Sequence, residues 1–197
     1  MKIYDVSQEV LSSSVYPGDP TPTISSLCSI ESGDLYNLSA FSMCAHNGTH
    51  IDAPLHFIKN GKSIDEINAS VFVGEAFVAH HNGLMSAKDA EDIMDKAKCI
   101  NPESAKRILI KGNSTVTDEA ARIFADNDIL LIGVESQSVG PIDAPMATHL
   151  ILLGAGVALL EGLRLAEVSE GEYILSASPL KIAGIEGSPC RAVLIKM

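Results

Sequence analysis

Short apolar runs alternate with amphipathic segments in the middle of the chain, and this order constrains the fold more than any other feature of the sequence. Runs rich in β-branched and apolar residues predict strands over 71–80, 107–111 and 129–134. Between these strands, the patterns of 86–98 and 117–125 predict two helices, each with a capping residue at its start. Strands that alternate with helices in this way indicate a buried sheet with helices packed on it.

Each predicted helix carries an apolar face, and strand patterns continue on both sides of the central region. The apolar positions are Ala90, Ile93, Met94 and Ala97 behind the capping Ser86, and Ala121, Phe124 and Ala125 in the second helix. Further strands are predicted over 2–6, 36–46, 157–161, 173–182 and 191–195, and a helix over 147–153. Strands outnumber helices, so we predict an α/β fold of the mixed α+β kind. No repeat or linker interrupts the chain, so we expect residues 1–197 to form a single domain.

The charge balance and the cysteine pattern argue against several classes of protein. The chain holds 14 basic against 25 acidic residues, and this net charge of −11 disfavours binding to nucleic acid or to an anionic membrane. The N-terminus lacks the apolar core of a signal peptide, and the longest apolar run, 150–160, is too short to cross a bilayer. The four cysteines are scattered with no CxxC pair, which is typical of reduced thiols, so we expect a cytoplasmic protein.

A cluster of three histidines and one aspartate within 11 residues is the clearest chemical signal in the sequence. Its members are His46, His50, Asp52 and His56, and neutral imidazole with carboxylate is a ligand set for Zn²⁺, Mn²⁺ or Fe²⁺. In an extended segment His50 and Asp52 point the same way, and Gly48 lets the chain turn so that His46 can join them. We expect a turn or loop that leaves the preceding strand. Hydrogen-bonded polar residues of a surface loop are the alternative.

A fourth histidine and a glutamate bracket the longest apolar run. His149 precedes the run and Glu161 follows it, and both side chains need polar partners if the fold buries them. Two interpretations are open from the residues alone. Either the pair belongs to a site, or His149 caps a helix and Glu161 is exposed beside Gly162.

Three other features carry weaker signals. Glu135 and Ser136 follow a predicted strand, and polar residues at the carboxyl end of a strand often contribute to a site, although a solvated loop is the alternative. His80 and His81 are neighbours on a predicted strand and point to opposite faces, so we expect structural or surface roles for them. The Gly-Ala-Gly sequence at 154–156 lacks the third glycine of a dinucleotide-binding fingerprint.

Residues 46–57, HNGTHIDAPLHF, resemble the HxGTHxDxPxHF signature of the cyclase family, whose members include bacterial kynurenine formamidases (arylformamidases) and isatin hydrolases. Residues 16–20, YPGDP, resemble the N-terminal W/Y-PGDP loop of that family. The segment GVESQSV at 133–139 is similar to its G-(I/V)-(D/E)-x-x-S-(V/I) motif. His149 and Glu161 resemble a late His and Glu pair of the family, so the likeness spans nearly the whole chain.

The resemblance implies a fold, an assembly and a set of metal ligands. The fold would be the swivelling β/β/α fold of the family, assembled as a homodimer or homotetramer. The implied ligands of one or two divalent ions per chain are His46, His50, Asp52, His149 and Glu161. Asp52 would bridge a first ion, held with the two earlier histidines, to a second. Zn²⁺ is the expected metal and Mn²⁺ the alternative, and His56 would be the general acid and base.

The expected activity is hydrolysis of a small amide, lactam, lactone or ester by metal-bound hydroxide, with His56 moving the proton. The candidate substrate contacts are Tyr16, Glu135 and Ser136. The formamidases of the family carry Trp where this chain has Tyr16, and this chain contains no Trp. The identity of the substrate therefore stays open.

Two other functions are compatible with the same residues. His50, Asp52 and His149 match the two-histidine, one-carboxylate set of non-haem Fe(II) oxygenases. That function leaves His46 and His56 unused, and the usual host is an all-β barrel, which the predicted helices do not suit. A protein that binds a metal or small ligand without catalysis is the third hypothesis, although the complete set of ligands together with the acid/base residue weighs against it.

Overall fold

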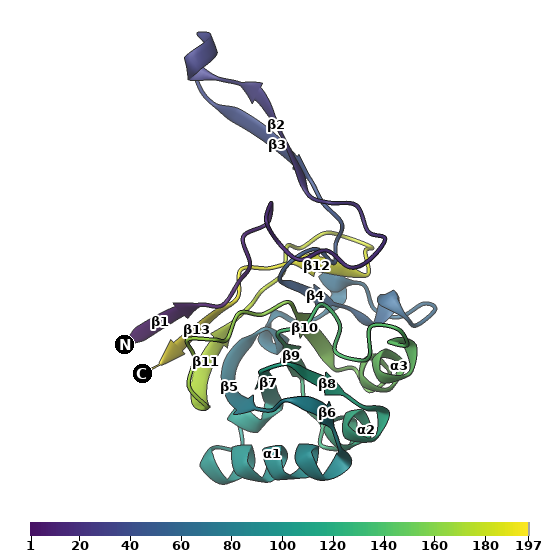
Figure 1. Ribbon diagram of the computed structural model, residues 1–197. Coiled ribbons are helices and arrows are strands. Elements are labelled where there is room, and N and C mark those ends of the chain that lie inside the picture. The colour runs from purple at the N-terminus through teal and green to yellow at the C-terminus, as the bar shows by residue number, and fades with distance from the viewer. Residues whose placement is uncertain (197) are drawn as a thin grey trace.

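The computed structural model describes residues 1–196, and a nine-stranded mixed sheet runs through this described part (Figure 1). In spatial order the strands are β1 (Lys2–Asp5), β13 (Val193–Lys196), β11 (Gly171–Ser176), β5 (Val73–His80), β7 (Arg107–Lys111), β9 (Leu131–Val134), β10 (Ala158–Glu161), β4 (His50–Asp52) and β12 (Gly187–Pro189). The strands from β5 to β10 run parallel, and those on either side are antiparallel. The predicted α/β class is therefore confirmed.

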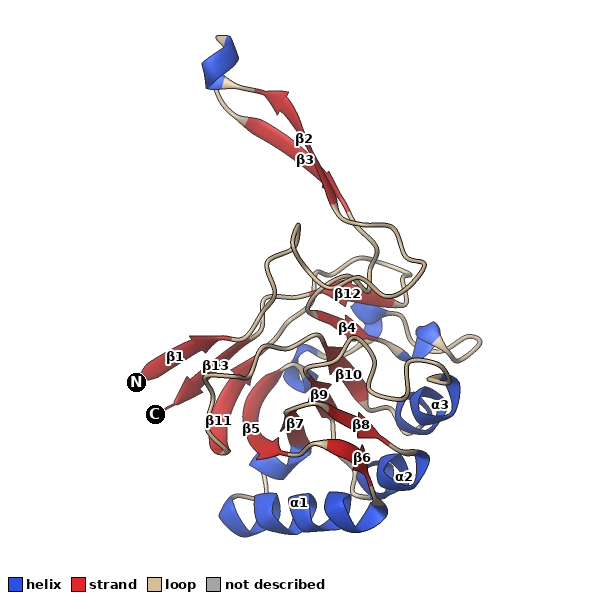
Figure 2. Cartoon of the chain, in the orientation of Figure 1, coloured by secondary structure: helices blue, strands red, loops and turns tan. Residues whose placement is uncertain are grey.

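Helices cover one face of this sheet: α1 (Ala87–Ile100), α2 (Asp118–Asp126) and α3 (Met146–Gly154) (Figure 2). Ser86 and Thr117 cap α1 and α2 as predicted, because each side chain accepts a hydrogen bond from the third backbone N–H of its helix. The apolar stripe predicted for the first helix is buried throughout. In the second helix Phe124 is fully buried, whereas Ala125 is only partly buried.

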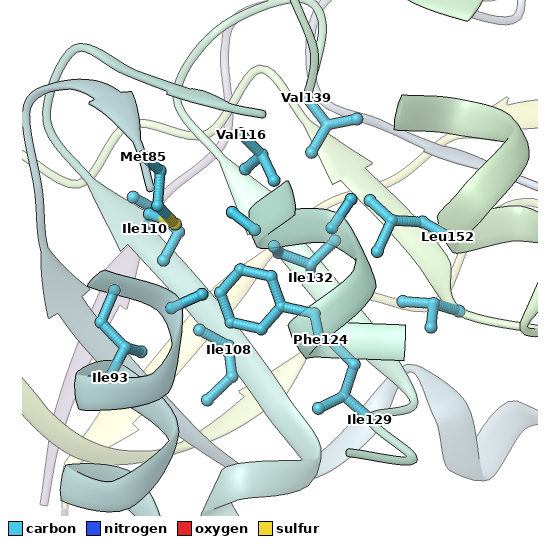
Figure 3. Packing of buried hydrophobic residues seen from close by; sticks show 14 of the residues in the cluster. Met85, Ile93, Ile108, Ile110, Val116, Phe124, Ile129, Ile132, Val139 and Leu152 are labelled. Atoms are coloured by element: carbon cyan, nitrogen blue, oxygen red, sulfur yellow. The ribbon is translucent and has the colours of Figure 1, made fainter. Parts of the chain in front are cut away.

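The core beneath the helices is built around the ring of Phe124. Side chains of β7 and β9, among them Ile108 and Ile132, surround this ring in the close view (Figure 3). All three side chains are inaccessible to solvent or nearly so. Burying each of them stabilises the fold by about 1.5–3 kcal/mol, so this layer anchors the helices to the sheet.

A second core fills the opposite side of the sheet. Successive residues of a strand face opposite ways, so Leu109 of β7 joins this core while Ile108 and Ile110 join the first. The second core includes Ile51 from β4 and Leu194 from β13, which lie near opposite ends of the strand order. The sheet therefore curls around this core (Figure 1).

Strand β4 brings the histidine and aspartate segment into the sheet. It pairs with β10 on one side and β12 on the other, so the predicted loop is wrong for His50–Asp52. The strand has only three residues, and its partners lie more than 100 residues away along the chain, so local periodicity does not reveal it. The register places Glu161 opposite His50 and Leu159 opposite Asp52. Because Leu159 belongs to the core beneath the helices, the site side chains also face that layer.

A hairpin stands apart from the main sheet. Among residues 1–196, strands β2 (Thr23–Cys28) and β3 (Leu38–Ser42) pair only with each other, and they extend well away from the body (Figures 1 and 2). A short 3-10 turn, Ile30–Ser32, lies at its tip. The strand predicted over 36–46 is present as β3 but ends at Ser42, and β2 was not predicted.

The remaining elements adjust the predicted boundaries. A small parallel pair joins β6 (Gly83–Met85) to β8 (Ser114–Val116), and neither strand was predicted. The strand predicted over 173–182 is shorter in the structure, where β11 (Gly171–Ser176) is followed only by an isolated bridge between Pro179 and Cys190 in the described residues. The helix predicted over 147–153 is confirmed as α3. Within residues 1–196, no helix combines the length and apolarity needed to cross a membrane.

Candidate metal centre

Six polar side chains from five parts of the fold converge around β4, β10 and α3, and Figure 1 shows where these elements lie. They are His46 before β4, His50 and Asp52 on β4, His56 in the 3-10 turn Pro54–His56, His149 on α3 and Glu161 on β10. The two β4 residues, the α3 histidine and the β10 glutamate are buried, while the other two histidines are partly exposed. The structure thus brings together the whole predicted set of ligands and the predicted acid/base residue.

A tight turn brings His46 back over β4. Gly48 takes a φ of +65°, a left-handed conformation that glycine adopts without strain, so the chain reverses just before the strand. The Gly48 carbonyl accepts a hydrogen bond from Nδ1 of His50 at 3.0 Å. The side-chain oxygen of Asn47 accepts another from the backbone N–H of Cys44 at 2.7 Å. The turn that delivers the first ligand is therefore held at both ends.

Asp52 is shared by two groups of ligand atoms. In the first group, Oδ1 of Asp52 lies 2.8 Å from Nδ1 of His46 and 3.4 Å from Nε2 of His50. In the second group, Oδ2 of Asp52 lies 3.7 Å from Nε2 of His149, and that nitrogen lies 3.4 Å from Oε1 of Glu161. Within each group of three residues the ligand atoms lie within 4.8 Å of one another. Each group has the size of a three-ligand cation site.

Backbone carbonyls orient the two buried imidazoles. Nδ1 of His50 donates to the Gly48 carbonyl, and Nδ1 of His149 donates to the Pro145 carbonyl at 2.7 Å. Each bond places the proton on Nδ1 and leaves Nε2 directed at the carboxylates, which is the arrangement found in metal-binding histidines. The buried atoms His50 Nε2 and Asp52 Oδ2 have no hydrogen-bond partner among the described residues. Since buried polar atoms are normally paired, these residues fit a bound cation.

The electrostatics of the cluster also favour a cation. Burial lowers the pKa of His50, but the carboxylates of Asp52 and Glu161 outweigh that effect and raise the pKa to about 10. Burial raises the pKa of Asp52, yet the rings of His46 and His50 outweigh it and hold that pKa well below its ordinary value. Two buried carboxylates at this position need positive charge beside them, either from protonated imidazoles or from a metal ion.

His56 has a different environment from the ligand histidines. Its Nε2 lies 4.0 Å from Oδ2 of Asp52, and its ring stacks on that of His46 with centroids 4.1 Å apart. It belongs to neither of the ligand groups found among the described residues. Burial lowers the pKa of His56 below its ordinary value. A histidine that is neutral near pH 7 and reaches a cavity can accept and return a proton there.

A cavity of about 320 Å³ opens over the cluster. Its lining residues are Tyr16, Asp19, Cys44, His46, His50, His56, Phe57, Gln137, Ser138, Pro145, His149 and Glu161. The volume is within the range of small-molecule sites. The phenol of Tyr16 donates a hydrogen bond to the Ile142 carbonyl at 2.7 Å, so one predicted substrate contact lies at the cavity and is fixed there.

The structure does not place the other two candidate substrate contacts at the cavity. The Glu135 carboxylate accepts hydrogen bonds from the backbone N–H groups of Gly112 and Leu165, at 2.6 and 2.7 Å. The Ser136 hydroxyl donates to the Ser138 carbonyl. Both side chains are therefore occupied with holding loops together, and Gln137 and Ser138 line the cavity instead. The motif at 133–139 indicated the right segment, but it did not indicate which side chains of that segment reach the cavity.

The structure also shows where the other residues lie whose roles the sequence left open, namely His149, Glu161, His80 and His81. His149 lies inside α3 rather than capping it, and Glu161 is buried rather than exposed. His81 contacts the Ser114 hydroxyl at 2.7 Å and His80 is exposed. Neither of these two belongs to a ligand group within the described residues, as expected of structural or surface histidines.

Comparisons with known proteins give a consistent result. The model of the family described as "Putative cyclase" matches residues 4–141. A kynurenine formamidase of Salinibacter ruber is 33% identical over 210 residues, covering 98% of this chain and 97% of the relative. A solved structure described as a potential metal-dependent hydrolase with cyclase activity superposes with a TM-score of 0.81 at 28% identity, covering 98% of this chain and 96% of the other.

The fold also recurs in a more distant protein. Isatin hydrolase A from Labrenzia aggregata, solved with benzyl benzoate bound, superposes with a TM-score of 0.81 at 22% identity, covering 100% of this chain and 94% of the other. The family match covers well over half of the chain and includes the turn, β4 and His56. The full-length relatives extend the likeness across α3 and β10, which carry the second ligand group. This chain belongs to the cyclase family.

Proposed function

We propose that this chain is a metal-dependent hydrolase that cleaves a C–N bond of a small amide. The observation that carries the proposal is Asp52, whose Oδ1 lies beside the first ligand group and whose Oδ2 lies beside the second, while the other four ligands line the cavity. The relatives support the chemistry, since one is named a kynurenine formamidase and a structural neighbour is described as a potential metal-dependent hydrolase.

The ligand groups suit one or two divalent ions. The first offers two imidazoles and a carboxylate, and the second offers one imidazole and two carboxylates. We propose Zn²⁺ as the metal, with Mn²⁺ as the alternative that the oxygen-richer second group would favour. A divalent metal bound here would polarise the substrate carbonyl and lower the pKa of water toward about 7, so that hydroxide is available at neutral pH.

His56 supplies the proton transfers. His56 lines the cavity, and its Nε2, 4.0 Å from Oδ2 of Asp52, is placed to accept the proton of the attacking water. As the C–N bond breaks, the same nitrogen returns the proton to the leaving amine, so the residue ends each cycle neutral. The stacked ring of His46 and the edge of Phe57 keep the imidazole in place during both transfers.

The walls of the cavity suit a flat, mainly apolar substrate. The ring centroids of Phe57 and His149 lie 4.6 Å apart, and Tyr16 and Pro145 complete the apolar wall. The Tyr16 hydroxyl already donates its proton to the Ile142 carbonyl, so Tyr16 contributes to the wall without a free hydrogen-bond donor. We therefore propose an aryl formamide or a fused lactam as the substrate class, with a cytoplasmic location as the scattered cysteines indicate.

The oxygenase alternative is supported less well. It requires only His50, Asp52 and His149, whereas the structure gathers His46 and His56 at the same cavity. Its usual host is an all-β barrel, and this sheet carries helices across one face (Figure 2). Oxygen uptake in the presence of Fe(II) would favour it over hydrolysis.

Metal analysis of the purified protein, followed by hydrolysis assays on N-formylkynurenine, isatin and simple aryl esters, tests the proposal. We expect at least one zinc or manganese ion per chain and turnover of one amide substrate. His56→Ala should lose turnover and keep its metal, while His80→Ala, a histidine outside the cavity, should behave as the wild type. Protein that takes up no metal after reconstitution would overturn the proposal. Metal binding without any turnover would favour the binding-protein hypothesis.

A further inference from the structure

The ring of His46 is held differently from the rings of the other two ligand histidines. In His50 and His149, Nδ1 donates to a backbone carbonyl and Nε2 is directed at the carboxylates. In His46 the order is reversed, because Nδ1 is the nitrogen that lies 2.8 Å from Oδ1 of Asp52. A neutral imidazole that binds a metal through Nδ1 carries its proton on Nε2, so that proton needs an acceptor of its own.

The Nε2 atom of His46 is buried and has no settled partner. It is inaccessible to solvent and makes no hydrogen bond of standard geometry among the described residues. Oε1 of Glu186 lies 3.4 Å away, and no other carboxylate oxygen of the described residues comes within 4.0 Å of Nε2. Buried N–H groups are normally paired, because an unpaired one has lost its bond to water with nothing in exchange. Glu186 is therefore the acceptor at hand for this proton.

The fold holds Glu186 at this place through its backbone. The Glu186 carbonyl accepts a hydrogen bond from the backbone N–H of Ala53 at 2.8 Å. The next residue, Gly187, begins β12 and pairs with Asp52 across the ladder to β4. The side chain of Glu186 is 41% exposed, so it has room to turn about its own dihedral angles and complete the hydrogen bond.

Neighbouring groups hold the ring of His46 in one orientation. The ring of His56 stacks on it with centroids 4.1 Å apart, and the ring of His50 meets it edge-on at 5.1 Å. The backbone of Gly187 lies close to its outer edge, since a Cβ added there would be 2.8 Å from Cε1 and 3.3 Å from Nε2. The edge that carries Nε2 is therefore directed at the segment that bears Glu186.

We propose that Glu186 is a positioning residue of the first ligand group, because its carboxylate accepts the Nε2 proton of His46 and so fixes Nδ1 as the nitrogen that binds the metal. The inference rests on the proposed metal centre. A carboxylate accepts this proton more strongly than a backbone carbonyl does, and the bond makes the opposite nitrogen a better electron donor to the metal. His46 thus gains from a side chain what the other two ligand histidines gain from carbonyls.

Glu186 acts from behind the site rather than from within it. It does not line the cavity, and it belongs to neither ligand group found among the described residues. The sequence signatures at 16–20, 46–57 and 133–139 do not include it either. A substitution at Glu186 is therefore expected to change metal binding and the position of the His46 proton while leaving the substrate contacts in place.

Zinc binding to the full-length chain, measured by competition with a chromophoric chelator, tests the inference. Glu186→Ala removes the acceptor, whereas Glu186→Gln keeps an acceptor oxygen without the charge. Asp65→Ala is the matched control, because Asp65 holds the same loop by accepting a hydrogen bond from the Gly184 N–H at 3.0 Å. We expect Glu186→Ala to weaken the apparent affinity for Zn²⁺ by about 10–100-fold and Glu186→Gln to weaken it less. Asp65→Ala should bind zinc like the wild type.

The position of the ring proton gives a second readout that a merely structural role would not change. A long-range ¹H–¹⁵N spectrum of zinc-loaded, ¹⁵N-histidine-labelled protein reports which nitrogen of each ring is protonated. We expect the proton of His46, assigned by comparison with His46→Gln, on Nε2, and the protons of His50 and His149 on Nδ1.

Three results would overturn the inference and leave the metal centre standing. They are a His46 proton on Nδ1 in the zinc-loaded wild type, a Glu186→Ala variant that binds zinc like Asp65→Ala, and equal losses of affinity in Glu186→Ala and Glu186→Gln. Equal losses would make the charged carboxylate itself a metal ligand. A wild type that binds no zinc would overturn the metal centre and this inference together.

Discussion

Gly187 on β12 offers a test of the first ligand group that leaves every proposed ligand in place. A Cβ added at Gly187 would lie 2.8 Å from Cε1 of His46 and 2.9 Å from the backbone oxygen of Ile51. Carbon atoms in contact normally stay about 3.5–4.0 Å apart, so the methyl group overlaps the imidazole by about 0.7 Å. The Ile51 oxygen belongs to the β4 ladder and cannot give way, so the His46 ring must move.

The size of the effect follows from this overlap. Forcing an extra methyl into a packed site costs about 1–3 kcal/mol of stability. Displacing a ligand from its supported position typically weakens metal binding by about 10–100-fold. We therefore expect Gly187→Ala to lower the apparent affinity for Zn²⁺ by that factor and to lower Tm by a few degrees. Gly154→Ala is the matched control, because a Cβ there meets nothing within 4 Å and Ala favours the helix.

Competition with a chromophoric chelator measures the zinc affinity of both variants, and thermal unfolding by circular dichroism measures their stability. Gly154→Ala should bind zinc like the wild type. If Gly187→Ala also binds zinc within twofold of the wild type while its Tm falls, His46 is not a ligand of the bound zinc. If neither zinc affinity nor Tm changes, the tight packing of β12 against the turn before β4 is itself refuted.

Four further outcomes follow from the structure. Asp52→Ala should lose both metal and activity, since both ligand groups use this carboxylate, and metal analysis beside the hydrolysis assay checks it. His56→Ala should lower kcat by about 10²–10⁴-fold with unchanged metal content. Removing the metal with a chelator should lower Tm, because an ion present at about 100 times its Kd stabilises the folded state by about 2.7 kcal/mol. Burial raises the pKa of Cys190 to about 12, so a thiol reagent at pH 8 should modify the exposed Cys99 and spare Cys190 until the chain is denatured.

The helices and strands whose defining contacts lie within a few residues of each other could be predicted from the sequence. Ser86 and Thr117 cap their helices through residues three positions away, so the capping pattern is complete within a few residues. Strand β7 was predicted with its observed boundaries, because its apolar run is buried on both faces and bounded by polar residues. These elements form under local rules, and the helices then cover the sheet face that their apolar stripes require.

Strands β2 and β4 could not be predicted, and the reasons differ. β2 has no buried residue to mark one face, so its alternation carries no signal. β4 becomes a strand only because β10 and β12 flank it, and three residues are too few for a period of two to stand out. For β4 the sequence contains the residues, but the hydrogen-bond partners of this strand are set by the topology of the whole chain.

The site shows which of its residues could be predicted from neighbouring residues in the sequence and which could not. His50 and Asp52 could be identified as a pair because two residues on one strand face share a direction. Nothing local decides whether Glu161 joins them or faces solvent. The register of β10 against β4 decides it, since Glu161 lies opposite His50 and on the same face as Leu159. A slip of one residue would exchange the faces, burying Glu161 among the apolar side chains around Leu160 and leaving the second ligand group without its glutamate. The apolar run before Glu161 therefore sets the position of the second ligand group, because its buried leucines hold β10 in register.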